Sequence, residues 1–448
     1  MLWQLSATDA AQRIRDGVIS SENLVQACLD RIAETDAGIK AWVHLDPEQA
    51  LDQARIMDRI RQTGRPLGPL HGIPVGIKDI FDTADMPTER GSPIYQGRQP
   101  DTDAAVIAKL KEAGAVILGK TYTTEVAFLH PTVTGNPHNL DHTPGGSSSG
   151  SAAAVAAGHV PLAIGSQTNG STVRPASFCG IYGFKPTRGV ISRTGCLQTS
   201  QSRDQVGVFA RTLDDAALLA DVLAGYDAGD PGSYVEPKPA LLSGARAEPP
   251  VEPDIAWLEL PFANRLDASS VDGFEELISA LGNRVERLPA PKSFEAVVQS
   301  HKIVHEYEIW HHLKADFEAG WDLVSDTLKP ALEQAQTLSK GQYEDALAML
   351  AGAQDYFEQF FLDYDAVLAP SSAGEAPLKS SGTGDPVFCT IWTFAGLPAL
   401  SLPLLTGSAG LPIGVQLIGS AEGDDRLLRT ANWLQQYLED PLDEGMPT

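Results

Sequence analysis

Residues 144–188 read PGGSSSGSAAAVAAGHVPLAIGSQTNGSTVRPASFCGIYGFKPTR. This stretch holds two Gly/Ser-rich loops separated by a run of small residues, and it contains no acidic residue although the whole chain is acidic. Glycine, alanine and serine remove side-chain bulk, so backbones can approach one another or a ligand closely. The stretch therefore indicates a site built from backbone donors and small hydroxyl groups, although tightly packed turns have a similar composition.

Three motifs occur in a fixed order along this stretch. GGSSSGSAAAVAAG (145–158) comes first, GSQTNGSTVRPASFCG (165–180) follows, and GFKPT (183–187) closes the series. Together they resemble the signature of the amidase signature family, whose members are serine hydrolases that cleave amides through a Ser, Ser, Lys triad. The resemblance implies an α/β/α sandwich in which helices flank a central mixed β-sheet. It also implies one domain over 1–448, with a signature core at about 70–215 and a variable, mostly helical, pocket-covering region at about 290–365.

The resemblance assigns catalytic roles to single residues. Ser171, in TNGS, matches the acylated nucleophile, and Ser147 matches the bridging serine whose preceding peptide bond is cis in the family. Lys78, in GIPVGIKD (72–79), matches the base. A lysine accepts a proton only when it is neutral, and burial favours that form, so we expect Lys78 to be buried. The expected oxyanion donors are the backbone N–H groups of Thr168, Asn169, Gly170 and Ser171.

Four positions depart from the family's usual residues. Asn169 and Ser149 stand where glycine is common, and Gln167 stands where aspartate is frequent. Arg174 lies three residues after Ser171, whereas many members have an arginine two residues after it. Because the triad is intact, these departures concern the choice of substrate more than the type of reaction.

Two rival motifs overlap the first loop. Residues 146–150 satisfy G-x-S-x-G, the nucleophile elbow of α/β-hydrolases, with Ser148 as the nucleophile. That elbow needs a buried strand immediately upstream, whereas GNPHNLDHTPG (135–145) is polar and rich in turn residues. A loop before a helix also suits a phosphate, but the lysine of a P-loop is absent here.

Composition limits the classes of partner. The chain has 448 residues, 43% of them hydrophobic and 20% charged, and its formal net charge is -25. This charge disfavours nucleic acid and anionic membrane surfaces as partners. The four cysteines, Cys28, Cys179, Cys196 and Cys389, form no C-x-x-C pair, and the N-terminal residues lack a signal-peptide pattern, so we expect a cytoplasmic protein.

No cofactor or metal is expected. Three histidines, His130, His138 and His142, gather in one loop, but no H-E-x-x-H pattern accompanies them, and a polar loop bordering a site explains them better than a metal centre. The adjacent pair His311 and His312 receives no role, because neighbouring positions cannot share one helix face.

Periodicity and capping residues predict the element order. We expect helices at 6–16, 20–36, 47–64, 102–114, 151–157 and 212–224, with strands at 73–78, 115–120 and 161–164. Residues 227–254 are rich in Pro, Gly and Ala and predict an exposed connection. Residues 293–361 predict a mainly helical, aromatic-rich segment whose aromatic side chains mostly belong to the core. The resemblance implies that a few of them line the pocket.

The preferred hypothesis is an amidase that hydrolyses the C–N bond of a small amide-like molecule, with carbamates and aryl amides included, through an acyl-serine. Its partner is then the small-molecule substrate alone, in a monomer or a homodimer. One alternative is the glutaminase subunit of a glutamine-dependent tRNA amidotransferase, from whose usual GSDTGGSIRQP pattern Gln167 and Arg174 depart. Another is a non-catalytic binding protein on the same fold.

Overall fold

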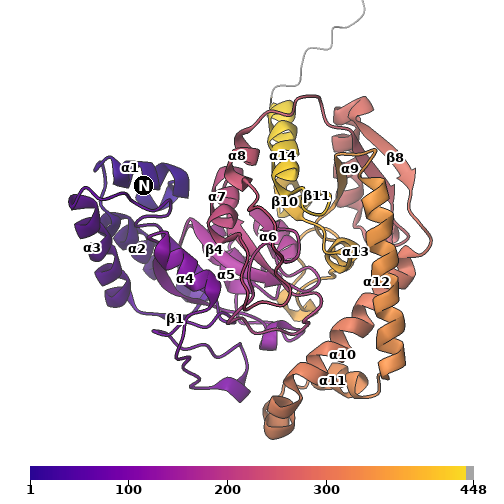
Figure 1. Ribbon diagram of the computed structural model, residues 1–448, viewed down its shortest axis with the longest axis horizontal. Coiled ribbons are helices and arrows are strands. Elements are labelled where there is room, and N and C mark those ends of the chain that lie inside the picture. Colours follow the sequence, from indigo (N-terminus) through magenta and orange to yellow (C-terminus); the bar gives the residue numbers. More distant parts are fainter. Residues whose placement is uncertain (440–448) are drawn as a thin grey trace, which may run out of the picture.

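The computed structural model describes residues 1–439, and in them eleven strands form one mixed sheet (Figure 1). The strand order is β1-β3-β2-β4-β6-β5-β10-β11-β9-β7-β8. Pairing is parallel between β2 and its neighbours β3 and β4, and between β7 and its neighbours β8 and β9, and it is antiparallel elsewhere. The strands are β1 (Trp42–Leu45), β2 (Pro74–Lys78), β3 (Val116–Thr121), β4 (Leu162–Gln167), β5 (Tyr182–Lys185), β6 (Gln205–Ala210), β7 (Ile255–Glu259), β8 (Val285–Pro289), β9 (Ala366–Pro370), β10 (Ala399–Thr406) and β11 (Pro412–Ile418).

Helices cover both faces of this sheet, as predicted. The α-helices are α1 (Ala7–Arg15), α2 (Ser21–Ile39), α3 (Pro47–Gln62), α4 (Ala105–Glu112), α5 (Ser149–Ala156), α6 (Val173–Cys179), α7 (Leu213–Leu223), α8 (Leu241–Arg246), α9 (Ala268–Leu281), α10 (Phe294–Gly320), α11 (Lys329–Gln336), α12 (Lys340–Phe360), α13 (Val387–Ala395) and α14 (Asp424–Glu439). Successive strand residues enter different cores: Ile117 packs with α4 and α7, whereas Val116 and Leu118 pack with α2, α3 and α5. This alternation is what a sheet buried on both sides requires.

Capping residues fix the predicted helix starts. The Ser6 and Ser20 side chains accept hydrogen bonds from the backbone N–H groups of Asp9 and Asn23, so α1 and α2 begin where the sequence predicts. The prediction for 227–254 is incomplete, because this segment also contains α8, whose Leu241 is fully buried. A six-residue helix carries too little periodicity to be read from the sequence.

The variable region forms a separate group of helices. Figure 1 shows α10, α11 and α12 together at one end of the long axis, opposite the end that holds α1 and α3. The N-terminal half of α10 returns to the centre of the molecule, where Val297, His301 and Val304 are buried. In the described residues, no helix is both long and apolar enough to cross a membrane.

Two parallel neighbours place the central loops. β2 ends at Lys78, β4 ends at Gln167, and the two strands pair in parallel with Ile77 opposite Ile164. Their carboxyl ends therefore meet at one edge of the sheet, where ligand sites of open α/β sheets are usually found. The loops that contain Ser147 and Ser171 lead from this edge into α5 and α6.

Candidate functional site

Lys78 is the buried cation at the centre of this edge. Its side chain is fully buried, and its Nζ donates to Ser147 Oγ at 2.7 Å and to Ser166 Oγ at 2.8 Å. Burial lowers the pKa of Lys78 to about 7, because the charged ammonium loses hydration that two hydroxyl groups do not replace. At neutral pH the amine is thus able to accept a proton. The sequence motifs did not single out Ser166 as a partner of this lysine.

The Ser147 loop is held by backbone contacts. The Gly146–Ser147 peptide bond is cis. The Ser147 carbonyl accepts from the backbone N–H of Thr124 at 3.1 Å, and the Gly146 carbonyl accepts from the Arg174 guanidinium at 2.7 Å. These bonds fix the carbonyls on both sides of Ser147 and leave its hydroxyl facing Lys78.

Ser148, the rival nucleophile, lies in a different environment. It is fully buried, and its hydroxyl donates to the Ser166 carbonyl at 3.3 Å. Turns and isolated bridges precede it, and the strand that a nucleophile elbow needs is absent from the described residues 125–146.

Ser171 lies in the loop between β4 and α6 and is partly exposed. Among residues 1–439 its hydroxyl makes no hydrogen bond, and the backbone N–H groups of Thr168, Asn169, Gly170 and Ser171 find no protein acceptor either. Four consecutive unpaired amides that end at a serine hydroxyl are a donor set suited to a negatively charged oxygen. We call residues 168–171 the oxyanion segment.

The first three carbonyl groups of the oxyanion segment are all occupied. The Thr168 carbonyl accepts from His301 Nε2 at 2.8 Å, the Asn169 carbonyl from Thr393 Oγ1 at 2.6 Å, and the Gly170 carbonyl from the Arg174 backbone N–H at 3.0 Å. These donors come from α10, α13 and α6, so three separate helices hold the segment.

The residues that depart from the family pattern have defined contacts. Gln167 Oε1 accepts from the backbone N–H groups of Thr172 and Val173 at 2.8 and 3.0 Å, and its Nε2 donates to Thr393 Oγ1 at 2.9 Å. Gln167 thus serves as an acceptor for the start of α6 without adding a charge. Asn169 Oδ1 accepts from Thr390 Oγ1 at 2.8 Å, which turns this side chain towards α13.

Arg174 links the two serine loops. Its guanidinium donates to the carbonyls of Gly146 and Gly384, while its backbone N–H binds the oxyanion segment. Burial lowers the pKa of Arg174 to about 10, which still leaves the group charged at neutral pH. The sequence showed that this arginine is displaced by one position, but its partners lie 28 and 210 residues away and are not evident from the sequence.

A cavity of about 270 Å³ adjoins the oxyanion segment at Asn169. Its remaining walls come from the loop after β3, from the segment between β7 and α9, from α10 and from the start of α13. They are Phe128, Leu129, Arg265, Val298, Gln299, His301, Lys302, His305, Glu306, Asp385, Pro386, Val387 and Thr390. Most aromatic side chains of 307–361 pack into the hydrophobic cores, as expected, and Trp310 stacks against Phe317. None of them lines this cavity in the described residues, whereas we expected that a few would line the pocket.

The three histidines that the sequence singles out do not line the cavity beside Asn169. His138 and His142 hydrogen-bond to the carbonyls of Cys179 and Ala376, and His130 lines a second cavity of about 420 Å³ together with Asp79 and Glu125. No cluster of potential metal ligands occurs in residues 1–439. The histidines at the candidate site are His301 and His305, four residues apart, a spacing that places both on one face of a helix.

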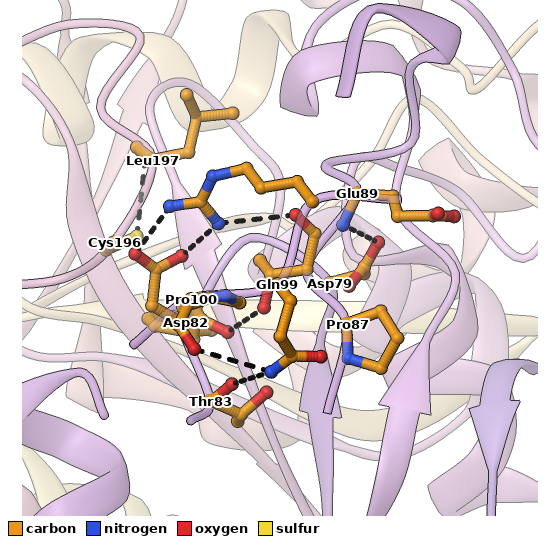
Figure 2. Close-up of polar contacts among 12 residues, drawn as sticks. Asp79, Asp82, Thr83, Pro87, Glu89, Gln99, Pro100, Cys196 and Leu197 are labelled. Atoms are coloured by element: carbon orange, nitrogen blue, oxygen red, sulfur yellow. Dashed lines mark hydrogen bonds and ion pairs between the residues drawn. The ribbon is translucent and has the colours of Figure 1, made fainter. Parts of the chain in front are cut away.

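The segment after Lys78 is anchored independently of the serine loops. Figure 2 shows the contacts of this segment, in which Arg98 forms a double ion pair with Asp82 at 2.7 and 2.8 Å and Gln99 Nε2 donates to the carbonyl of Thr83 at 3.3 Å. The Asp82 N–H also binds the Gly195 carbonyl at 2.9 Å. These contacts fix the chain direction as it leaves Lys78.

Comparison with known proteins identifies the family and its fold. The Amidase family model matches residues 23–428. The chain is 34% identical to a glutamyl-tRNA(Gln) amidotransferase subunit from Natranaerobius thermophilus, over 98% of this chain and 96% of that protein. It is 28% identical to a structure described as an unexpected vestigial protein complex that reveals the evolutionary origins of an s-triazine catabolic enzyme, with a TM-score of 0.91 over 96% of this chain and 98% of that one.

A third relative is the peptide amidase of Stenotrophomonas maltophilia. The two chains are 29% identical and superpose with a TM-score of 0.83 over 97% of each. The family match spans both serine loops, the strand that ends in Lys78 and the closing strands of the sheet. The chain therefore belongs to the amidase family.

Proposed function

We propose that this protein hydrolyses an amide or amide-like C–N bond through an acyl-enzyme on Ser171. The observation that carries the proposal is the buried Lys78 amine at 2.7 Å from Ser147 Oγ, at the same sheet edge as the unpaired amides of the oxyanion segment. Neutral Lys78 takes the Ser147 proton, Ser147 takes the Ser171 proton, and Ser171 Oγ attacks the carbonyl carbon. The Asn169, Gly170 and Ser171 N–H groups stabilise the resulting oxyanion.

The second half of the reaction uses the same groups. As the C–N bond breaks, Ser147 returns a proton to the leaving nitrogen and is reprotonated from Lys78. Water then attacks the Ser171 ester, and its proton follows the same route through Ser147. The acyl group leaves as a carboxylic acid, and Ser171 regains its hydroxyl. No step needs a redox partner.

The substrate under this proposal is a small molecule. The cavity of about 270 Å³ beside Asn169 has room for a group of a few to about a dozen non-hydrogen atoms, as small-ligand pockets do. Its charged residues are already paired, since Arg265 binds Asp385 at 2.8 Å and Lys302 binds Glu306 at 3.5 Å. This balance favours a neutral amide, carbamate or aryl amide.

A second candidate is the glutamine-hydrolysing subunit of an amidotransferase complex. The 34% identity to a glutamyl-tRNA(Gln) amidotransferase subunit, over nearly the full length of both chains, favours it, and other subunits would then be the partners. The comparisons thus favour this candidate, whereas the neutral Gln167 and the shifted Arg174, which depart from the usual pattern of that subunit, favour the free amidase. Both candidates share the chemistry of Lys78, Ser147 and Ser171.

Labelling tests the shared chemistry. The purified protein is treated with a fluorophosphonate, which reacts with activated serines, and the modified peptide is identified by mass spectrometry. We expect one adduct on Ser171, absent from Ser171→Ala and from Lys78→Ala. An adduct on Ser148 would contradict the assignment, and the absence of any adduct would favour a non-catalytic binding protein.

A substrate panel separates the two candidates. L-glutamine, short aliphatic amides, aryl amides and carbamates are offered to the isolated chain, and ammonia or amine release is measured. Turnover of the simple amides without glutaminase activity supports the free amidase. Preferential glutaminase activity, together with co-purification of other subunits from the native source, would support the amidotransferase candidate and rule out the first.

A further inference from the structure

His301 is a buried histidine without a role in the proton relay described above. It lies in the N-terminal half of α10, is only 2% exposed, and places Nε2 at 2.8 Å from the Thr168 carbonyl oxygen. Because a carbonyl oxygen only accepts hydrogen bonds, Nε2 must carry the hydrogen. Burial lowers the pKa of His301 to about 4, so at neutral pH the ring is uncharged and holds this one tautomer.

The Thr168 carbonyl and the Asn169 N–H belong to the same peptide unit. In a planar trans peptide these two groups point in opposite directions, so a donor that fixes the carbonyl also aims the amide. By the same geometry, Thr393 Oγ1 on the Asn169 carbonyl aims the Gly170 N–H, and the Arg174 N–H on the Gly170 carbonyl aims the Ser171 N–H. The amides of Asn169, Gly170 and Ser171 therefore each have one carbonyl anchor behind them.

The Thr168 side chain is also linked to α10, through a hydrogen-bond chain that begins at His305, one turn after His301. His305 Nε2 lies 3.2 Å from Thr199 Oγ1, and Thr199 Oγ1 donates to Asp204 Oδ1 at 3.3 Å. The Thr168 hydroxyl donates to the same carboxylate oxygen. His301 and His305 thus bracket one residue of the oxyanion segment, and both also line the cavity of about 270 Å³.

We propose, resting on the proposed function, that His301 is a positioning residue that aims the Asn169 amide at the oxyanion. α10 also forms a wall of the cavity. The helix that contacts the bound substrate therefore also orients the Asn169 N–H, which donates to the oxyanion of that substrate. His301 itself does not touch the reacting atoms. Its contribution is the direction of the Asn169 N–H, and losing the anchor lets the Thr168–Asn169 peptide rotate.

The test compares two substitutions of one histidine. In His301→Gln, the side-chain amide nitrogen reaches the position of Nε2 and still donates to Thr168. In His301→Phe, the ring is retained and the donor is lost. His312→Phe, an exposed change on the same helix, is the matched control. The measured quantities are the rate constant of fluorophosphonate bonding to Ser171 (kinact) and the half-saturating concentration (KI).

We expect His301→Phe to lower kinact by at least about tenfold, a fraction of the roughly 100-fold to 1,000-fold loss seen when an oxyanion donor is removed outright. KI should stay within about twofold, because the anchor acts on the developing charge and not on initial binding. We expect His301→Gln to recover most of kinact and His312→Phe to match the unsubstituted protein.

Three results would overturn the inference. They are an unchanged kinact in His301→Phe, an equal loss in His301→Gln and His301→Phe, or a loss confined to KI. If His301→Phe does not fold, His301→Asn replaces it, because its shorter amide cannot reach Thr168; a kinact equal to that of His301→Gln then refutes the anchor. Failure of the unsubstituted protein to label at Ser171 would instead refute the proposed function, and the inference with it.

Discussion

Lys120 Nζ lies 3.0 Å from Asp79 Oδ1, both side chains are buried, and Asp79 is the residue that follows Lys78 in the sequence. Lys120 also donates to the carbonyls of Phe81 and Pro87 at 3.0 Å each and to Thr88 Oγ1 at 2.6 Å. The carboxylate that follows Lys78 in sequence is thus neutralised by a lysine on the neighbouring strand. Lys78 itself makes no ion pair among the described residues and keeps the lowered pKa that its proposed role needs.

Removing this buried partner should be costly. In Lys120→Met, Asp79 would be left as an unpaired buried charge, and we expect the free energy of unfolding to fall by about 3–5 kcal/mol. Lys111→Met, which removes a half-exposed pair with Asp103, should cost no more than about 1 kcal/mol. Urea denaturation of both variants measures the difference. An equal loss of unfolding free energy in the two variants would show that the buried Lys120–Asp79 pair stabilises the fold no more than a surface pair does.

The proposed base gives a pH dependence with a definite sign. Because burial lowers the pKa of Lys78 to about 7, the reactive neutral amine accumulates as the pH rises through that value. We expect the rate of Ser171 labelling to rise about tenfold per pH unit below pH 7 and to level off above it. Lys78→Ala should remove most of the labelling at every pH without unfolding the protein.

Lys185 provides a control for this profile. It is also fully buried, with its pKa lowered to about 7 by burial, but it binds Gln205 Oε1 at 2.8 Å and contacts neither serine. Lys185→Met should keep the shape of the pH profile, whatever its effect on stability. A rate that does not change between pH 6 and pH 8 in the unsubstituted protein would contradict the role of Lys78.

The same lysine should lower the stability of the fold. An unfolded Lys78 has a pKa near 10.5, so between about pH 7 and pH 10.5 the unfolded chain binds a proton that the folded chain does not. Raising the pH removes this advantage of the unfolded state, and the contribution of Lys78 to stability grows by about 1.4 kcal/mol per pH unit in that window. From pH 7 to pH 9, the free energy of unfolding of the unsubstituted protein should therefore rise relative to that of Lys78→Met. A constant difference, measured by urea denaturation at both pH values, would mean that Lys78 keeps its proton when folded.

Many family members have an acidic residue at the position of Gln167, and two substitutions test what this position requires. Gln167→Leu would leave the backbone N–H groups of Thr172 and Val173 without an acceptor, at a cost of about 1–3 kcal/mol for each buried group. Gln167→Glu keeps the acceptor and should retain most of the stability. Thermal melting curves of the two variants distinguish these outcomes. An equal loss of stability in Gln167→Leu and Gln167→Glu would show that the acceptor at the start of α6 is dispensable.

Much of the fold follows from local sequence. Ser6 and Ser20 mark helix starts, the small residues of 145–158 mark the close approach of α5, and the apolar run of 115–118 marks a buried strand. The sequence does not reveal α8, because a helix of six residues lies within a Pro/Gly-rich connection. It also does not show which aromatic residues of α10 and α12 would reach the pocket, because pocket and core positions share one periodicity.

In the candidate site, too, some residues can be recognised from local motifs and others cannot. Lys78, Ser147 and Ser171 lie in motifs that can be recognised locally, and Lys78 and Ser147 are in contact. The groups that fix the oxyanion segment, His301 and Thr393, lie 133 and 224 residues from their partners. No local pattern signals such pairs. The four-residue spacing of His301 and His305 is the one local signal that could have been noted, because it places two histidines on one helix face.

The bond from Thr393 to the Asn169 carbonyl has a consequence for how the protein is made. Ribosomes extend a chain from its N-terminus, so Lys78, Ser147 and Ser171 emerge long before α13. During that interval, the Gly170 amide has no anchor behind it, because the Thr393 hydroxyl has not yet been synthesised. The proposed hydrolytic competence therefore has to wait until α13 has emerged and has folded against the oxyanion segment.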